Sequence, residues 1–266
     1  MKDFGCSIAE NIFTPDDPFY SVTHDIRDIL STLIASEDAA NDEIAKNIFN
    51  LDLTSVEGHI VGARRRGVIH HSVLSQAIFR DVSTFEDRIC RMVEQSMLMK
   101  FLQNCFDTPV IDTTNLAFRI RSNSSNPELA LPYHQDCSLW NQADMLAGSD
   151  RRFIGLIAWV PLMDVGELTP GLQLIRSASA DILPISATPK TQFTHLEVDF
   201  NDDGRQTHWT PTLKKGSSIL FSGTTLHRSD PDPLKTDTRL SVDLRFFDNN
   251  LIPAALENHR MRSLKN

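Results

Sequence analysis

The segment Arg239-Leu240-Ser241-Val242-Asp243-Leu244-Arg245-Phe246 alternates polar and apolar side chains without a break. Successive side chains of a strand point to opposite faces, so this pattern predicts a β-strand with one apolar face in the core. The opposite face is strongly polar, and such a face lies either in water or along a polar cavity. His227 precedes this strand closely in the sequence, which favours the cavity.

From about residue 110 to about residue 250, the chain contains further short runs that are rich in β-forming residues. Turn formers such as Thr169-Pro170-Gly171 separate the runs, which is the rhythm of an all-β sandwich or barrel. We therefore expect a jelly-roll barrel over about 110–250. The expected strands are 116–121, 133–140, 154–162, 172–175, 195–200, 217–221 and 239–247.

The N-terminal part, about 1–109, has the apolar spacing of helices. Helices are predicted over 21–34, over 41–49 and from a capping box at Ser83-Thr84-Phe85-Glu86 along one stripe to Phe106. No linker or repeat interrupts the chain. The sequence thus predicts one domain over 1–266, mainly β, with N-terminal helices that buttress the barrel.

Composition narrows the class of partner and the compartment. The formal net charge is -9, which argues against a nucleic acid as the main partner. We find no signal peptide, and the most apolar run, 154–163, is too short to span a bilayer. The four cysteines show no C-x-x-C spacing and are typical of reduced thiols. These features predict a cytoplasmic protein with no membrane partner.

The motif His134-Gln135-Asp136 and the distant His227 carry the chemistry. On a strand, His134 and Asp136 would share one face, and a second imidazole from another strand could reach the same metal ion. Two histidines and one carboxylate form the facial set that leaves coordination positions open on Fe(II). Open positions are what oxygen chemistry requires, so the motif predicts an Fe(II) site.

A carboxylate clamp follows the second histidine. Arg239 lies 12 residues beyond His227, across a turn-rich stretch, so it can return on a neighbouring antiparallel strand. Its guanidinium could then grip a carboxylate with two parallel hydrogen bonds. Ser229 has the same strand parity as His227 and could hold the same group. The pattern favours a keto-diacid that chelates iron at one end and is anchored at the other.

These motifs resemble the phytanoyl-CoA dioxygenase family of Fe(II)/2-oxoglutarate-dependent oxygenases over about 116–247. The family's fold is a double-stranded β-helix, a cupin-like jelly roll. The resemblance implies that His134, Asp136 and His227 hold iron. It implies that Arg239 and Ser229 bind 2-oxoglutarate and that Trp159 packs beside this cosubstrate.

The resemblance further implies an enzyme that uses O2 and 2-oxoglutarate to oxidise a C–H bond of a small molecule, with succinate and carbon dioxide as coproducts. Hydroxylation, desaturation and ring closure are all open outcomes, and natural-product biosynthesis is the expected setting. Related halogenases have a small residue at the position of Asp136, so the aspartate favours oxygenation. The substrate and the oligomeric state do not follow from the sequence.

The chain departs from the family at one turn. Many members have Pro-Gly-Ser-His after the strand that ends here at Ile175, whereas this chain has Arg176-Ser177-Ala178-Ser179. That turn binds no metal, so the departure concerns the local loop and the substrate pocket.

Other interpretations remain open at this point. His134 and Asp136 can be an exposed strand pair, with His227 a core histidine. His195-Leu196-Glu197 is a second H-x-acid motif and forms a rival triad with His227. At the level of function, the alternatives are a non-catalytic jelly-roll binding protein and a cupin-type metalloenzyme that uses no 2-oxoglutarate.

Overall fold

The structure is a computed structural model, and strands dominate it. It describes residues 6–14, 68–70, 82–114, 116–121, 132–138, 155–176, 182–187, 197–202, 206–237 and 239–265. The described strands form two antiparallel sheets, so the expected mainly β architecture is confirmed. The helices expected over 21–34 and 41–49 lie outside the described residues.

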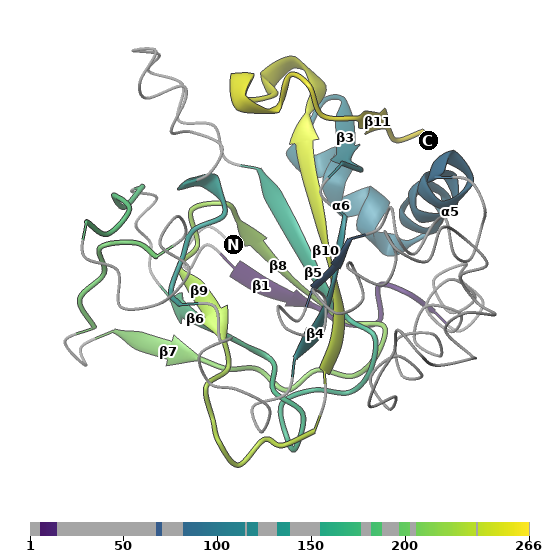
Figure 1. Ribbon diagram of the computed structural model, residues 1–266. Helices are drawn as coiled ribbons and strands as arrows, with labels where there is room; N and C mark the ends of the chain where they lie inside the picture. Colours follow the sequence, from purple (N-terminus) through teal and green to yellow (C-terminus); the bar gives the residue numbers. More distant parts are fainter. Residues whose placement is uncertain are drawn as a thin grey trace, which may run out of the picture.

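The larger sheet has eight strands (Figure 1). Its main path runs β1 (Cys6–Ala9), β8 (Ser218–Ser222), β5 (Leu156–Pro161), β10 (Arg239–Asp248), β3 (Pro109–Asp112) and β11 (Met261–Ser263). Off this path, β4 (Ala117–Arg121) pairs with β10, and β2 (Val68–His70) pairs with β4. The smaller sheet orders β7 (Thr207–Trp209), β6 (Leu172–Arg176) and β9 (His227–Ser229).

Strand β10 lies in the middle of the larger sheet. It pairs with β5 along one edge, while β4 and β3 share its other edge. Its apolar residues Val242, Leu244 and Phe246 are buried, as the alternation predicts. Its polar residues Arg239, Ser241 and Asp243 are also buried, so the polar face lines the interior and not water.

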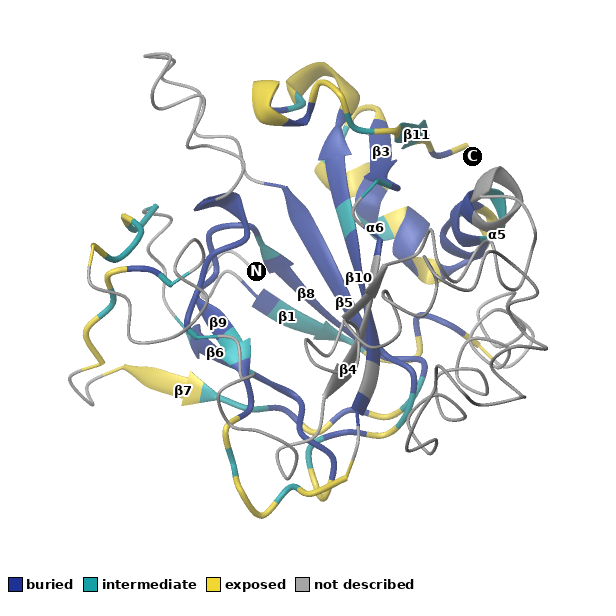
Figure 2. Cartoon of the chain, in the orientation of Figure 1, coloured by how far each residue is buried: buried dark blue, intermediate teal, exposed yellow. Residues whose placement is uncertain are grey.

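The main core cluster joins the two sheets. It combines Ile157 and Trp159 of β5 with Phe221 of β8 and with Leu172 and Leu174 of β6. Figure 2 shows β5 buried along its length, whereas much of the edge strand β7 is exposed. Polar side chains held within this apolar surround lose water, so each needs a partner or a ligand.

The predicted helical stripe behind Ser83 forms two helices, α5 (Val82–Glu94) and α6 (Met97–Cys105). Ser83 lies within α5, so the predicted capping box is not where the helix starts. The predicted stripe is broken because Ser96 caps α6: its hydroxyl accepts from Leu98 N (3.2 Å) and donates to Val93 O (2.8 Å). Two short 3₁₀ turns, η2 (Asn249–Leu251) and η3 (Ala254–Leu256), follow β10.

Two predicted strands are wrong in the described residues. Within 133–140, His134 makes an isolated bridge and the chain then turns at Asp136. Within 195–200, the described part makes one isolated bridge, at Val198. Both runs have β-forming composition, but a turn or a single bridge partner ends the pairing at once. Among the described helices, none is long and apolar enough to cross a membrane.

Candidate metal and cosubstrate site

The backbones of His134 and His227 lie directly opposite each other. The two residues form an isolated antiparallel bridge in which His134 N donates to His227 O (3.0 Å) and His227 N donates to His134 O (3.1 Å). Cross-strand neighbours bring their side chains together on one face. The two imidazoles accordingly lie with ring centroids 4.2 Å apart.

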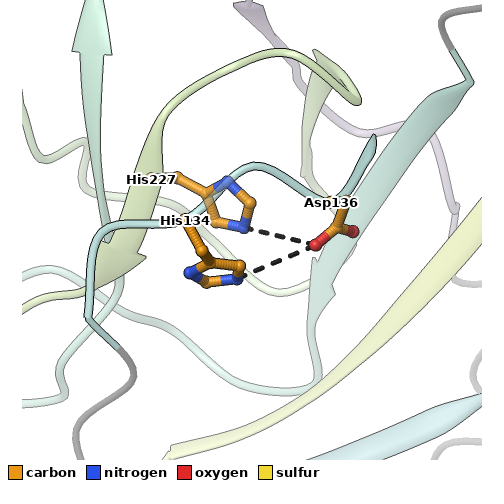
Figure 3. A group of neighbouring side chains, drawn as sticks. All are labelled: His134, Asp136 and His227. Atoms are coloured by element: carbon orange, nitrogen blue, oxygen red, sulfur yellow. Dashed lines mark ion pairs between the residues drawn. The ribbon is translucent and has the colours of Figure 1, made fainter. Parts of the chain in front are cut away.

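Asp136 completes the group from the turn that follows the bridge (Figure 3). Its Oδ1 lies 3.7 Å from His134 Nε2 and 3.9 Å from His227 Nε2. All three residues are buried, and one ligand atom from each lies within 4.8 Å of the others. The described residues contain no other such group of three histidine, cysteine or acidic side chains. The triad expected from the sequence is therefore brought together.

The three residues lie together as expected, but the geometric reason that the sequence suggested was wrong. His134 and Asp136 converge because the chain turns after a single bridge, and not because they alternate along a strand. Gln135, between them, holds the turn. Its side-chain Nε2 donates to Thr224 O (2.6 Å), and its side-chain Oε1 accepts from Leu183 N (2.8 Å).

The outer nitrogen of each imidazole is tied to the backbone. His134 Nδ1 lies 2.8 Å from Pro132 O, and His227 Nδ1 lies 2.9 Å from Thr225 O. A carbonyl only accepts, so each Nδ1 carries a proton, and in the neutral ring this leaves the lone pair on Nε2, which faces the centre of the group. Metal-bound histidines are held in this way, and the donor set suits Fe(II).

Arg245 of β10 lies beside Asp136 and was not singled out from the sequence as a site residue. Its Nε donates to Asp136 Oδ2 (3.1 Å), and its Nη2 lies 3.8 Å from Asp243 Oδ2. Burial alone lowers the pKa of Arg245, but the Asp136 and Asp243 carboxylates raise it by more, so the guanidinium stays charged. The signal that could have found it is strand parity: Arg245 shares the polar face of Arg239.

A cavity adjoins the triad, with about 340 Å³ of open space when its mouth is included. The three triad residues and the three residues expected at the cosubstrate all line it. The lining is His134, Asp136, Ile157, Trp159, Leu172, Phe221, His227, Ser229, Arg239 and Asp243. The structure thus gathers at one cavity His134, Asp136, His227, Arg239, Ser229 and Trp159.

Arg239 is buried against Trp159 in this cavity. Its Nη1 donates to Gly171 O (2.7 Å), and its guanidinium carbon lies 5.3 Å from the centre of the Trp159 ring. The indole Nε1 of Trp159 is buried and has no hydrogen-bond partner among the described residues. A buried arginine and an unpartnered N–H group fit an anionic ligand with oxygen acceptors.

The rival triad falls partly outside the described residues and stays a prediction. His195 lies outside the described residues, and Glu197 does not belong to the His134–Asp136–His227 group. Strand β6 ends at Arg176, the first residue of the unusual turn, and residues 177–179 of that turn lie outside the described residues.

Three solved structures share the architecture at low sequence identity. EvdO2 from Micromonospora carbonacea var. aurantiaca matches with a TM-score of 0.55 at 13% identity, over 92% of this chain and 86% of that one. The epimerase SnoN, solved with Fe³⁺, alpha ketoglutarate and nogalamycin RO, matches with 0.50 at 15%, over 92% and 80%. The non-heme monooxygenase ThoJ matches with 0.50 at 12%, over 93% and 75%.

No protein-family model matches the chain, and no curated protein matches it. Identities this low make the likeness one of fold. The chain therefore shares the fold of these three structures, and this likeness agrees with the double-stranded β-helix that its sequence predicts.

Proposed function

We propose that the chain is an Fe(II)- and 2-oxoglutarate-dependent oxygenase that acts on a small molecule. One observation carries the proposal: two imidazole Nε2 atoms and one carboxylate oxygen converge, buried, at a cavity that also contains a buried arginine. In this proposal His134, Asp136 and His227 hold the iron. Arg239, Ser229 and Trp159 hold 2-oxoglutarate.

The chain's own residues divide the work. The triad would hold the metal through two imidazoles and one carboxylate and would leave other positions to ligands. Arg239 provides the charge for the distal carboxylate of the cosubstrate, with Ser229 beside it. The apolar side chains of Ile157, Leu172 and Phe221 keep water from the cavity. With O2, iron and 2-oxoglutarate supply the oxidation of a C–H bond, coupled to loss of carbon dioxide and formation of succinate.

The outcome at the substrate is a finer part of the proposal. Asp136 occupies a metal position, which favours oxygenation over halogenation. SnoN is described as an epimerase and ThoJ as a monooxygenase, so one fold serves several outcomes. The substrate class that we propose is a small molecule of the kind made in natural-product biosynthesis.

Two other functions predict different behaviour. A non-catalytic binding protein would form no succinate, and a cupin-type metalloenzyme would need metal but no 2-oxoglutarate. The buried Arg239 beside Trp159 favours the cosubstrate-dependent enzyme over both.

The test compares His227→Ala with the unaltered protein under anaerobic loading with Fe(II). The unaltered protein should bind one iron and, once O2 is admitted, form succinate slowly from 2-oxoglutarate even without substrate. His227→Ala should lose both iron and succinate while remaining folded. His259→Ala is the matched control, since His259 pairs with Asp112 away from the cavity. Iron and succinate that survive His227→Ala would refute the proposal.

A further inference from the structure

Asp136 presents its two carboxylate oxygens to different partners. Oδ1 faces the two imidazoles, at 3.7 Å and 3.9 Å, whereas Oδ2 accepts from Arg245 Nε at 3.1 Å. Figure 3 shows one oxygen between the histidines and the other turned away from them. A carboxylate binds a metal through one oxygen or through both, and the second mode uses one more position on the ion.

We propose that Arg245 is a positioning residue that keeps Asp136 a one-oxygen ligand and so preserves an open position on the metal. This inference rests on the proposed metal site. A guanidinium Nε–H is held rigidly by its planar group, so it fixes the orientation of the carboxylate as well as its charge.

The surroundings hold Arg245 itself in place. Its side chain is 11% exposed, and Asp243 contacts it from the same strand face. A buried guanidinium between two carboxylates is an ion cluster that has already lost most of its water. Its geometry is therefore set by folding, before any metal binds, and the two roles of the Asp136 oxygens are set with it.

Strand β10 thus carries both the arginine of the cavity and the arginine that holds Asp136. Arg239 and Arg245 share its polar face, six residues apart, one at the expected cosubstrate end and one at the metal ligand. Between them, Ser241 and Asp243 are buried on the same face. One rigid strand in the centre of the sheet consequently fixes the spacing between clamp and metal.

The test replaces iron with Co(II), whose visible absorption reports coordination number, and uses no turnover. Arg245→Met keeps an unbranched side chain and removes every donor. We expect it to weaken cobalt binding roughly tenfold to hundredfold, as losses of such supporting contacts do. We also expect its cobalt spectrum to shift toward higher coordination, because the Arg245 hydrogen bond no longer turns Oδ2 away from the metal. The cobalt affinity of Arg245→Lys should lie between those of Arg245→Met and the unaltered protein, since lysine keeps the charge but not the planar pair of donors.

Arg228→Met is the matched control. Arg228 follows His227 directly, but its guanidinium lies over the Tyr133 ring and bonds Gln173, away from the triad. Its cobalt affinity and spectrum should equal those of the unaltered protein. Should Arg245→Met not fold, Arg245→Lys alone decides the matter.

The outcomes separate the two proposals. If the unaltered protein binds no cobalt at the triad, the proposed function fails and this inference fails with it. If it binds cobalt, and Arg245→Met and Arg245→Lys bind it with the same affinity and spectrum, only the role of Arg245 is overturned. A weaker affinity with an unchanged spectrum also overturns the one-oxygen role, because it shows a general loss of stability.

Discussion

Arg239 is held in place by contacts that need no ligand. Its Nη1 hydrogen bond to Gly171 O and its position over Trp159 order the side chain during folding. A ligand that meets an ordered side chain does not have to restrict its rotamers, so more of the interaction energy appears as affinity. A change of Arg239 is therefore the most direct test of whether the cavity binds 2-oxoglutarate.

We expect Arg239→Lys to weaken 2-oxoglutarate binding by on the order of 1.5–3 kcal/mol, because lysine keeps the charge but loses the planar fork. The dissociation constant should rise by roughly tenfold to hundredfold. Titration calorimetry on the anaerobic metal-loaded protein measures it. Arg176→Lys is the control, since that guanidinium lies over Trp209 and lines no part of the cavity. Equal affinities in Arg239→Lys and the unaltered protein would contradict the assignment.

Which residues gather at the cavity was predictable from the sequence, and how the chain brings them together was predictable only in part. The order of His134, Asp136, His227 and Arg239 was enough to nominate the cluster. Arg245 was missed because its role depends on meeting Asp136 across 109 positions of sequence separation. A pattern of alternation reveals which face a residue lies on but not which distant oxygen it meets.

At the scale of elements, strands with strong alternation or long apolar runs were predictable. Strands β4 and β5 fall within predicted runs, and β6, β8 and β10 each extend one residue beyond theirs. The short strands β1, β2, β3, β7 and β11 were not predicted, because three or four residues carry too little periodicity and depend on a partner. The same cause explains why the bridge at His134 was taken for a strand.

The connection from β5 to β6 depends on one glycine. Gly166 has φ of +110°, and its N–H donates to Thr169 O (2.8 Å) to close the turn. A Cβ at this position would lie 2.5 Å from the Thr212 Cα atom. Both the backbone angle and the space therefore exclude a side chain without local rearrangement.

We predict that Gly166→Ala lowers the free energy of unfolding by about 1–3 kcal/mol. Urea unfolding of the metal-free protein measures the change. Gly171→Ala is the control, because a Cβ there meets its nearest neighbour, Pro211 O, at an ordinary 3.7 Å. Two variants of equal stability would show that the turn relaxes at no cost.

For the molecule as a whole, a buried thiol predicts weaker stability in alkali. Burial raises the pKa of Cys90 in α5 to about 11. An unfolded thiol loses its proton near pH 8.5. Between these values the folded state holds the proton and the unfolded state does not, so the free energy of unfolding falls as pH rises.

Replacing the Cys90 thiol should make the free energy of unfolding depend less on pH in alkali. We expect Cys90→Ala to lose less stability than the unaltered protein between about pH 8.5 and pH 11, whatever its stability at neutral pH. Cys105→Ala serves as the comparison, since Cys105 is exposed and its replacement should change the slope less. Urea unfolding at several pH values gives both slopes. Identical slopes for Cys90→Ala and the unaltered protein would be contrary to this account.

The position of β10 bears on how the chain is made. Ribosomes deliver residues in order, and β10 follows each of the strands that it joins: β3, β4 and β5. Until residues 239–248 leave the exit tunnel, the larger sheet lacks its middle and those strands present open edges. Exposed strand edges recruit other chains, so nascent copies of this protein are candidates for chaperone protection up to that moment. The same late strand carries Arg239 and Arg245, so its arrival completes the middle of the sheet and the cavity wall together, before β11 adds the last edge strand.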